Sequence, residues 1–180
     1  MGSDKALLRV GDQPVIQLLA DRLCELTDQV FLSTDNPGQY DFLNLIPIGD
    51  KYPCRGPLAG LHAALLNTTR TRVLLLACDL PGVSSALLRR MVDFSDDYDV
   101  VIPVTSDRRL QPVCAVYGRN CLSLVEKYLN AGESRVVRLA EDPRLRVRRL
   151  TPPEGCFTDS QLLDVNSPED FAEFLRLINS

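Results

Sequence analysis

The chain has 180 residues, of which 45% are hydrophobic and 24% charged, and this composition indicates one ordinary globular domain over residues 1–180. Its net charge of -4 and pI near 5.0 argue against nucleic acid or an anionic membrane as a partner. No apolar run approaches the ~18 residues of a membrane-spanning helix, and the first residues do not resemble a signal peptide. We therefore expect a cytoplasmic protein.

The cysteine and histidine content excludes several kinds of site. The six cysteines stand singly, and no Cys-x-x-Cys pair suggests a zinc ribbon or a redox pair, so we expect reduced thiols. His62 is the one histidine, which excludes a His-rich metal site. No Gly-x-Ser-x-Gly motif offers a nucleophilic serine, which disfavours a Ser-His-Asp triad.

Helical and strand patterns alternate along the first half of the chain. Pro14 suits the first turn of an amphipathic helix, and Ser84 or Ser85 suits a helix cap. Pro47 restricts its strand to a sheet edge. The patterns predict, in chain order, helix 15–26, strand 29–33, strand 45–48, helix 58–66, strand 72–78 and helix 84–92.

The second half continues in the same way. Ser167 can cap a last helix that has Pro168 in its first turn and acidic residues after it. The patterns before it predict strands 99–104 and 112–117, helices 121–129 and 134–140, and strands 145–150 and 162–165. Continuous apolar strands alternating with helices indicate an α/β domain with a mostly parallel sheet covered on both faces.

Ligands of open parallel sheets bind at the carboxyl ends of the strands, so Asp79, directly after strand 72–78, is the first candidate site residue. Its carboxylate could hold a hard cation such as Mg²⁺, or it could bind backbone amides in a turn. Asp50, after strand 45–48, has the same two interpretations. Residues 55–60 (Arg-Gly-Pro-Leu-Ala-Gly) could present helix-start amides to an anion or simply begin a helix. Lys5 could bind phosphate or be a solvated charge.

Six motifs occur in a particular order: Gly2-x-Asp4-Lys5, Gly-Pro-Leu-Ala-Gly at 56–60, Cys-Asp-Leu-Pro at 78–81, Gln-Pro-Val at 111–113, Ala-Gly-Glu-Ser-Arg at 131–135 and Asp-Val-Asn-Ser-Pro at 164–168. This ordered set resembles the molybdenum cofactor guanylyltransferases over essentially the whole chain. The resemblance implies a three-layer, Rossmann-like nucleotidyltransferase fold. It also implies a nucleotide-binding half over about 1–95 and a pterin-substrate half over about 96–180.

The resemblance implies transfer of GMP from GTP to a molybdopterin cofactor, with pyrophosphate as the leaving group. Lys5 and Asp79 would be catalytic, and Asp79 would also be the ligand of Mg²⁺. The expected nucleotide contacts are Lys5, Ser33, Asp50, Gly56, Pro57, Leu58 and Asp79. Arg135 and Asn166 would bind the pterin substrate, although a solvated arginine and an Asx turn are the plainer interpretations. Partners would be GTP, molybdopterin and, transiently, molybdoenzymes or other cofactor-synthesis proteins.

Two departures from the family pattern bear on these expectations. The family pattern begins with an apolar strand and a Leu-x-Gly-Gly-x-Ser-x-Arg loop before its Met-Gly-x-Asp-Lys motif, and this sequence begins at Met1-Gly2. We expect the two neighbours of that strand to present bare apolar edges, either because the sequence starts at an internal methionine of a longer protein or because it is a truncated copy. Ser33 stands where the family commonly has an asparagine that helps to read guanine; Asp35 or Asn36 could substitute for it.

Two further hypotheses stay open at this point. The fold could serve a CTP-using or sugar-phosphate nucleotidyltransferase, because the lysine and the Gly-Pro-Leu-Ala-Gly motif recur in such enzymes. The chain could also be a non-catalytic copy that binds a partner protein. Nucleotide titration would separate the first of these from guanylyl transfer, and the coding sequence upstream of Met1 would test the second.

Overall fold

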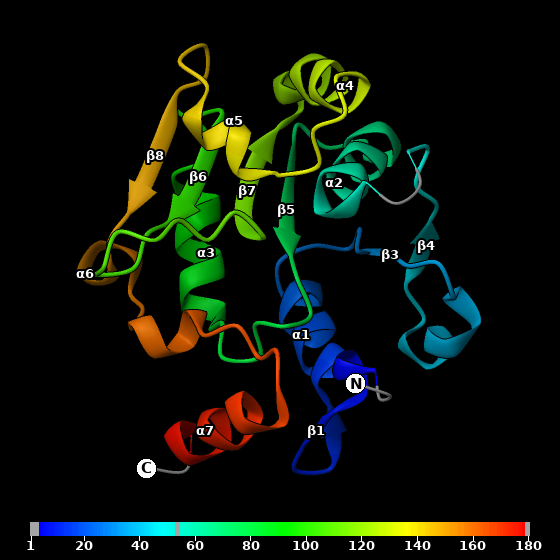
Figure 1. Cartoon of the computed structure of the whole chain (residues 1–180), viewed down its shortest axis with the longest axis vertical. Coiled ribbons are helices and arrows are strands. Elements are labelled where there is room, and N and C mark those ends of the chain that lie inside the picture. Colours follow the sequence, from blue (N-terminus) through cyan, green and yellow to red (C-terminus); the bar gives the residue numbers. More distant parts are fainter. Residues whose placement is uncertain (1–3, 53–54, 179–180) are drawn as a thin grey trace.

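The computed structural model describes residues 4–52 and 55–178 (Figure 1). Met1, Gly2 and Ser3 of the first motif, and Cys54, lie outside the described residues. The helices are α1 Val15–Cys24, α2 Gly56–Asn67, α3 Ser85–Asp93, α4 Leu122–Asn130, α5 Val137–Glu141, α6 Pro152–Gly155 and α7 Pro168–Ile178, with 3-10 turns η1 Lys5–Leu7, η2 Pro37–Leu43, η3 Arg119–Cys121 and η4 Asp159–Leu162. The strands are β1 Arg9–Val10, β2 Gln13–Pro14, β3 Phe31–Ser33, β4 Ile46–Ile48, β5 Arg72–Leu76, β6 Val100–Pro103, β7 Cys114–Gly118 and β8 Val147–Leu150.

The main sheet has the strand order β5-β7-β6-β8. The β6–β8 pair is parallel, whereas β7 runs antiparallel to both β5 and β6. β3 and β4 form a separate parallel pair, and β1 and β2 a short antiparallel hairpin that no sequence pattern predicted. The predicted α/β class is therefore confirmed, with parallel strands on both sides of an antiparallel insertion at β7.

Side chains of the central strands alternate between two cores, as a period of two requires. Val100, Ile102, Ala115 and Tyr117 pack with α2, α4 and α5 on one face. The side chains between them in sequence pack with α3 on the other face, and these are Val101, Cys114 and Val116. This gives the three layers, helices–sheet–helix, that the sequence predicted.

Several predicted element ends are confirmed, and one strand is not. The Ser84 hydroxyl accepts the Leu87 N–H at 3.2 Å, which is the predicted cap of α3. Residues 162–165 form no strand, because η4 ends at Leu162 and Val165 is joined to the strand-end loop by a single bond, from its N–H to the Asp79 carbonyl at 2.8 Å. The helix predicted over 134–140 begins only at Val137, because the preceding amides bind the Glu133 carboxylate instead.

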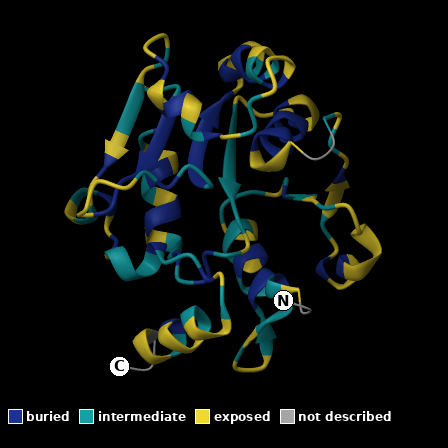
Figure 2. Cartoon of the chain, viewed as in Figure 1, coloured by how far each residue is buried: buried dark blue, intermediate teal, exposed yellow. Residues whose placement is uncertain are grey.

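The sheet is interrupted between β3 and β5. β5 pairs only with β7, and β3 only with β4, among the described strands. All five residues of β5 are half-buried, although the neighbouring strands β6 and β7 are fully buried (Figure 2). A cavity of ≈ 790 Å³ lies between the two open edges and is lined by residues of both strands. The bare apolar edges expected from the sequence are present.

Two remaining expectations concern membrane-spanning segments and the cysteine thiols. No helix among residues 4–52 and 55–178 is long and apolar enough to cross a membrane. The five described cysteines are all free thiols, and two of them, Cys114 and Cys121, are buried in the core.

Candidate active site

Three of the expected site residues lie together where β5 ends. Asp79 follows the strand, and its carbonyl accepts the N–H of Val165 at 2.8 Å, which fixes the loop that carries Asn166 beside it. Lys5 Nζ, from η1, donates to Asn166 Oδ1 at 3.0 Å. Lys5 and Asn166 are 161 positions apart in sequence, so this contact joins the first and last motifs of the chain.

The buried charge of the Asp79 carboxylate is only partly compensated by its neighbours. Its Oδ1 atom is buried and has no hydrogen-bond partner among the described residues. Burial, followed by the negative charge of Asp164, raises the pKa of Asp79, and its backbone and Lys5 lower it only in part. An uncompensated buried acceptor costs free energy in the protein alone and offers a ligand to a cation.

The neighbouring carboxylate, Asp164, is held in place by two side chains. Gln111 Nε2 donates to Asp164 Oδ1 at 2.9 Å and also to the Leu162 carbonyl at 3.1 Å. Arg109 donates to Asp164 Oδ2 at 3.1 Å. Arg109 and Gln111 lie in the segment before β7, and together they hold this second negative charge near Asp79.

A second group of expected residues lies at the mouth of the cavity. Ser33, which ends β3, donates to Asp50 Oδ1 at 3.3 Å, and both residues line the cavity together with Gly56 and Pro57 of α2. Burial raises the pKa of Asp50, and the Ser33 hydrogen bond opposes that rise. A Cβ at Gly60 would lie 3.0 Å from the Ser33 hydroxyl oxygen, so glycine there permits the close approach of α2 to β3.

The start of α2 exposes backbone rather than side chains to this mouth. Gly56 has φ +58°, a left-handed conformation that strongly favours glycine. Leu58 is fully buried, and its side chain packs into the core with α4, so only its backbone could meet a ligand. The first amides of an α-helix have no intrahelical partner and attract anions or polar ligand edges.

The loop 131–135 lies against the start of α2. Arg55 Nη1 donates to the Gly132 carbonyl at 3.1 Å, and a Cβ at Gly56 would lie 3.8 Å from the Ser134 carbonyl oxygen. The structure therefore brings the loop that carries Arg135 to the start of α2, whereas Asn166 lies with Lys5. The two residues expected to bind the pterin substrate stand in separate groups.

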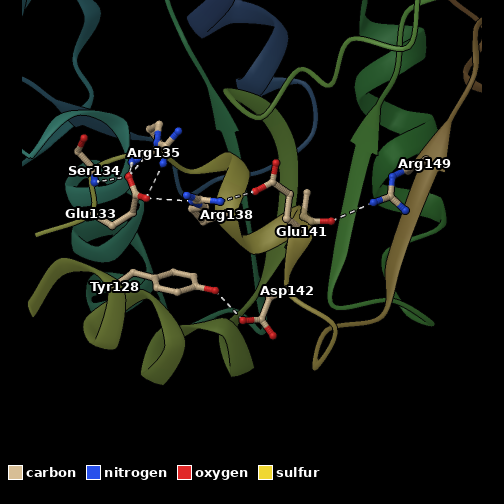
Figure 3. A network of polar contacts seen from close by, with 9 residues as sticks. Tyr128, Glu133, Ser134, Arg135, Arg138, Glu141, Asp142 and Arg149 are labelled. Atoms are coloured by element: carbon tan, nitrogen blue, oxygen red, sulfur yellow. Dashed lines mark hydrogen bonds and ion pairs between the residues drawn. The ribbon is translucent and has the colours of Figure 1, made fainter. Parts of the chain in front are cut away.

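Arg135 is held by an ion-pair network that the sequence did not predict (Figure 3). Glu133 accepts two hydrogen bonds from the Arg135 guanidinium, each at 3.0 Å, and one from Arg138 at 3.0 Å. Glu141 binds the far side of Arg138 at 3.1 Å. The two arginines hold the pKa of Glu133 far below its ordinary value, and Glu133 in turn raises the pKa of Arg135 and of Arg138.

The described residues can supply part of a divalent-cation site. No group of three His, Cys, Asp or Glu side chains gathers into a metal cluster within residues 4–52 and 55–178. The unpaired Asp79 oxygen nevertheless suits Mg²⁺, which commonly takes one or two carboxylates and completes its shell with water and phosphate oxygens.

Three side chains that hold the candidate site residues in place were not predicted, although each stands in a quoted motif. Asp164 and Glu133 lie inside motifs whose other members were singled out, and Gln111 opens the Gln-Pro-Val motif. The sequence did contain one signal for two of them. Gln111, just before a buried strand, and Asp164, two positions before Asn166, are polar residues whose side chains need hydrogen-bond partners if they are buried. Their actual partners are long-range and could not be assigned without the fold.

Known proteins resemble this chain in both sequence and structure. A protein from Pelotomaculum thermopropionicum named "Probable molybdenum cofactor guanylyltransferase" is 33% identical over 179 residues, which cover 96% of this chain and 84% of that protein. The crystal structure of molybdopterin-guanine dinucleotide biosynthesis protein A from Archaeoglobus fulgidus superimposes with a TM-score of 0.79 at 19% identity, covering 99% of this chain and 92% of that one. A Mycobacterium tuberculosis protein crystallised in complex with manganese gives a TM-score of 0.72 at 21% identity, covering 96% and 91%. The family model described as the MobA-like NTP transferase domain matches residues 1–147, and the chain belongs to that family.

Proposed function

We propose that this protein transfers GMP from GTP to a molybdopterin cofactor and forms a molybdopterin guanine dinucleotide with release of pyrophosphate. The relative from Pelotomaculum thermopropionicum bears the name of this activity, and the Archaeoglobus fulgidus protein is named for the same product. The observation that carries the proposal is the unpaired, buried Asp79 oxygen beside Asp164 and Lys5. It is a carboxylate prepared for a cation at the carboxyl end of a strand, where nucleotide phosphates bind in such folds.

The cation would be Mg²⁺, with Asp79 as its protein ligand. When bound, Mg²⁺ would neutralise charge on the α-phosphate and on the departing pyrophosphate. The solved relative from Mycobacterium tuberculosis, which contains manganese, is consistent with a divalent cation in this fold. In the metal-free protein the Asp164 charge works against ionisation of Asp79, and a bound cation would relieve that repulsion.

Lys5 and the start of α2 would bind the nucleotide. Lys5 Nζ is placed beside Asp79, where its charge would meet the triphosphate, and it would exchange its bond to Asn166 for phosphate oxygens. Gly56, Pro57 and the Leu58 backbone would lie along the nucleoside, and the paired Ser33 and Asp50 side chains would contact its polar edges. The Asp50 carboxylate accepts hydrogen bonds, which suits the N–H groups of guanine and the ribose hydroxyls.

The transfer itself needs no nucleophilic side chain. A terminal phosphate oxygen of molybdopterin would form the bond to the α-phosphorus, and the bond from that phosphorus to the oxygen bridging to the β-phosphate would break. The protein would contribute in-line positioning and positive charge opposite the leaving group. Arg135, fixed by Glu133, and Asn166 would hold the pterin substrate. A cytoplasmic location and transient contact with molybdoenzymes or other cofactor-synthesis proteins would follow from this role.

Nucleotide titration tests the proposal. With Mg²⁺ present, GTP is expected to bind more tightly than CTP, and Lys5→Ala should weaken GTP binding roughly 10- to 100-fold, since a charge-assisted contact contributes about 1.5–3 kcal/mol. Lys127→Ala, which removes an exposed lysine at the end of α4, is the matched control and should bind GTP normally. Tighter binding of CTP, or full GTP affinity in Lys5→Ala, would contradict the assignment.

A further inference from the structure

The loop after β5 carries Asp79 and continues to the start of α3. Leu80, Pro81 and Val83 in this loop are buried, so their backbone carbonyls need partners inside the protein. Arg22, in the last turn of α1, supplies a partner for two of them. Its Nη1 atom donates to the Pro81 carbonyl at 2.9 Å and also to the Val83 carbonyl, so one guanidinium nitrogen binds the loop at two points.

Arg22 occupies this place at an electrostatic cost. The side chain is half-buried, and burial lowers the pKa of its guanidinium, an effect that the charge of Glu25 opposes only in part. A charged group that gives up water needs other polar partners, and the two loop carbonyls are such partners. Removing Arg22 would therefore take a donor from two buried carbonyls, and the loop would lose a point of attachment to α1.

The same loop packs closely on the segment that leads to Asp164. A Cβ at Gly82 would lie 3.0 Å from the Gln161 Cα atom and 3.1 Å from the Gln161 carbonyl oxygen, and both of these are backbone atoms of η4. A side chain at this position would push the two segments apart. Arg22 and Gly82 thus hold the loop in two ways, one through hydrogen bonds from α1 and the other through contact with η4.

We propose that Arg22 is a positioning residue for the cation site, because it fixes the loop 80–83 from which the Asp79 carboxylate is presented. The proposal rests on the assignment of Asp79 as the cation ligand in the proposed function. The Asp79 carbonyl is bonded to the Val165 N–H, but the carboxylate Oδ1 atom has no hydrogen-bond partner among the described residues. The direction of this carboxylate therefore depends on the backbone that carries it, and Arg22 fixes that backbone on the side of α3.

Binding of Mn²⁺, followed by the electron paramagnetic resonance signal of the free ion, tests this role without nucleotide or turnover. Arg22→Met keeps an apolar stem and removes the donors. We expect it to weaken Mn²⁺ binding roughly 10-fold, the lower end of the effect of residues that hold a metal ligand in place. Arg22→Lys should restore most of the affinity, because an ammonium group at the place of Nη1 can donate to both carbonyls.

Two control variants separate positioning from the loss of charge and from the loss of stability. Arg89→Met removes an arginine of α3 whose ion pair with Glu25, at 3.1 Å, joins α3 to the end of α1 outside the loop. Tyr117→Phe removes a hydrogen bond to the Pro112 carbonyl in another part of the fold. Circular dichroism checks that each variant is folded, and both controls should bind Mn²⁺ as tightly as the unmodified protein.

The outcomes distinguish the positioning role from the cation site itself. Normal Mn²⁺ affinity in Arg22→Met, together with a loss in Asp79→Asn, would overturn the positioning role and leave the cation ligand in place. Unchanged affinity in Asp79→Asn would refute the cation ligand, and the positioning role with it. Equal weakening in Arg22→Met and Tyr117→Phe would assign the effect to lost stability, and no recovery in Arg22→Lys would show that the two carbonyl bonds do not hold the site.

Discussion

Replacing Asp79 with asparagine should make the metal-free protein more stable and the enzyme inactive. Asparagine keeps the size of the side chain and removes its charge, so it removes the repulsion from Asp164 and the cost of burying an ionised, unpaired oxygen. An unsatisfied buried group costs about 1–3 kcal/mol, and we expect a gain of about 1 kcal/mol because the amide is satisfied only in part. For a chain of this length that gain raises Tm by roughly 2–4 °C. The loss of the cation ligand should lower turnover at least ~100-fold.

Thermal unfolding in EDTA and pyrophosphate release with GTP, molybdopterin and Mg²⁺ measure the two effects. Asp97→Asn, an exposed carboxylate in the loop after α3, is the control and should change neither. A less stable Asp79→Asn protein would show that the carboxylate is compensated in a way the structure does not contain. Normal turnover in that variant would refute the assignment of Asp79 as the cation ligand.

The same carboxylate makes a prediction about pH. Because the folded-state pKa of Asp79 is raised above its ordinary value of 3.8, the folded chain binds this proton more tightly than the unfolded chain. The contribution of Asp79 to the stability of the metal-free protein should therefore increase as the pH falls from neutral toward 3.8, with Asp50 contributing in the same direction. Chemical denaturation at several pH values should show a smaller increase in Asp79→Asn, and an identical pH dependence in both proteins would argue against a raised pKa.

Other predictions concern the network and the core. Glu133→Gln should release Arg135 and raise KM for the pterin substrate with little change in kcat, and steady-state kinetics in which only kcat falls would contradict a positioning role. Tyr117→Phe should cost ~1–2 kcal/mol, because the half-buried Pro112 carbonyl loses the 2.7 Å hydrogen bond from the hydroxyl of the buried Tyr117; denaturant unfolding with an unchanged midpoint would count against it. Ser84→Ala should cost ~1 kcal/mol in the same measurement and Ser84→Gly only a few tenths, and equal losses would show that the hydroxyl does not cap α3.

Elements determined by local chemistry were predictable from the sequence. The apolar run of β5 and the Ser84 cap of α3 depend on neighbouring residues, and both appear where they were expected. The segment 162–165 was misread because its apolar residues resemble a strand, whereas only Val165 meets the strand-end loop through a backbone bond. A short apolar run cannot specify whether a neighbouring strand is available to pair with it.

The site was predictable in its members and not in its grouping. Lys5, Asp79 and Asn166 were each chosen as separate candidates, but their association depends on contacts across 161 positions. The resemblance assigned Arg135 and Asn166 to the same substrate, whereas the fold puts the loop that carries Arg135 against the start of α2. The supporting residue Glu133 acts through ion pairs whose geometry arises only when the loop 131–135 is folded.

The most direct test of guanylyl transfer follows the α-phosphate of GTP. The protein is incubated with molybdopterin, Mg²⁺ and GTP labelled at the α-phosphorus. We predict that the label enters a pterin guanine dinucleotide with one pyrophosphate released for each label transferred, and that CTP labelled in the same way transfers much less. Absence of label from the pterin product, or preferential transfer from CTP, would contradict the proposed function.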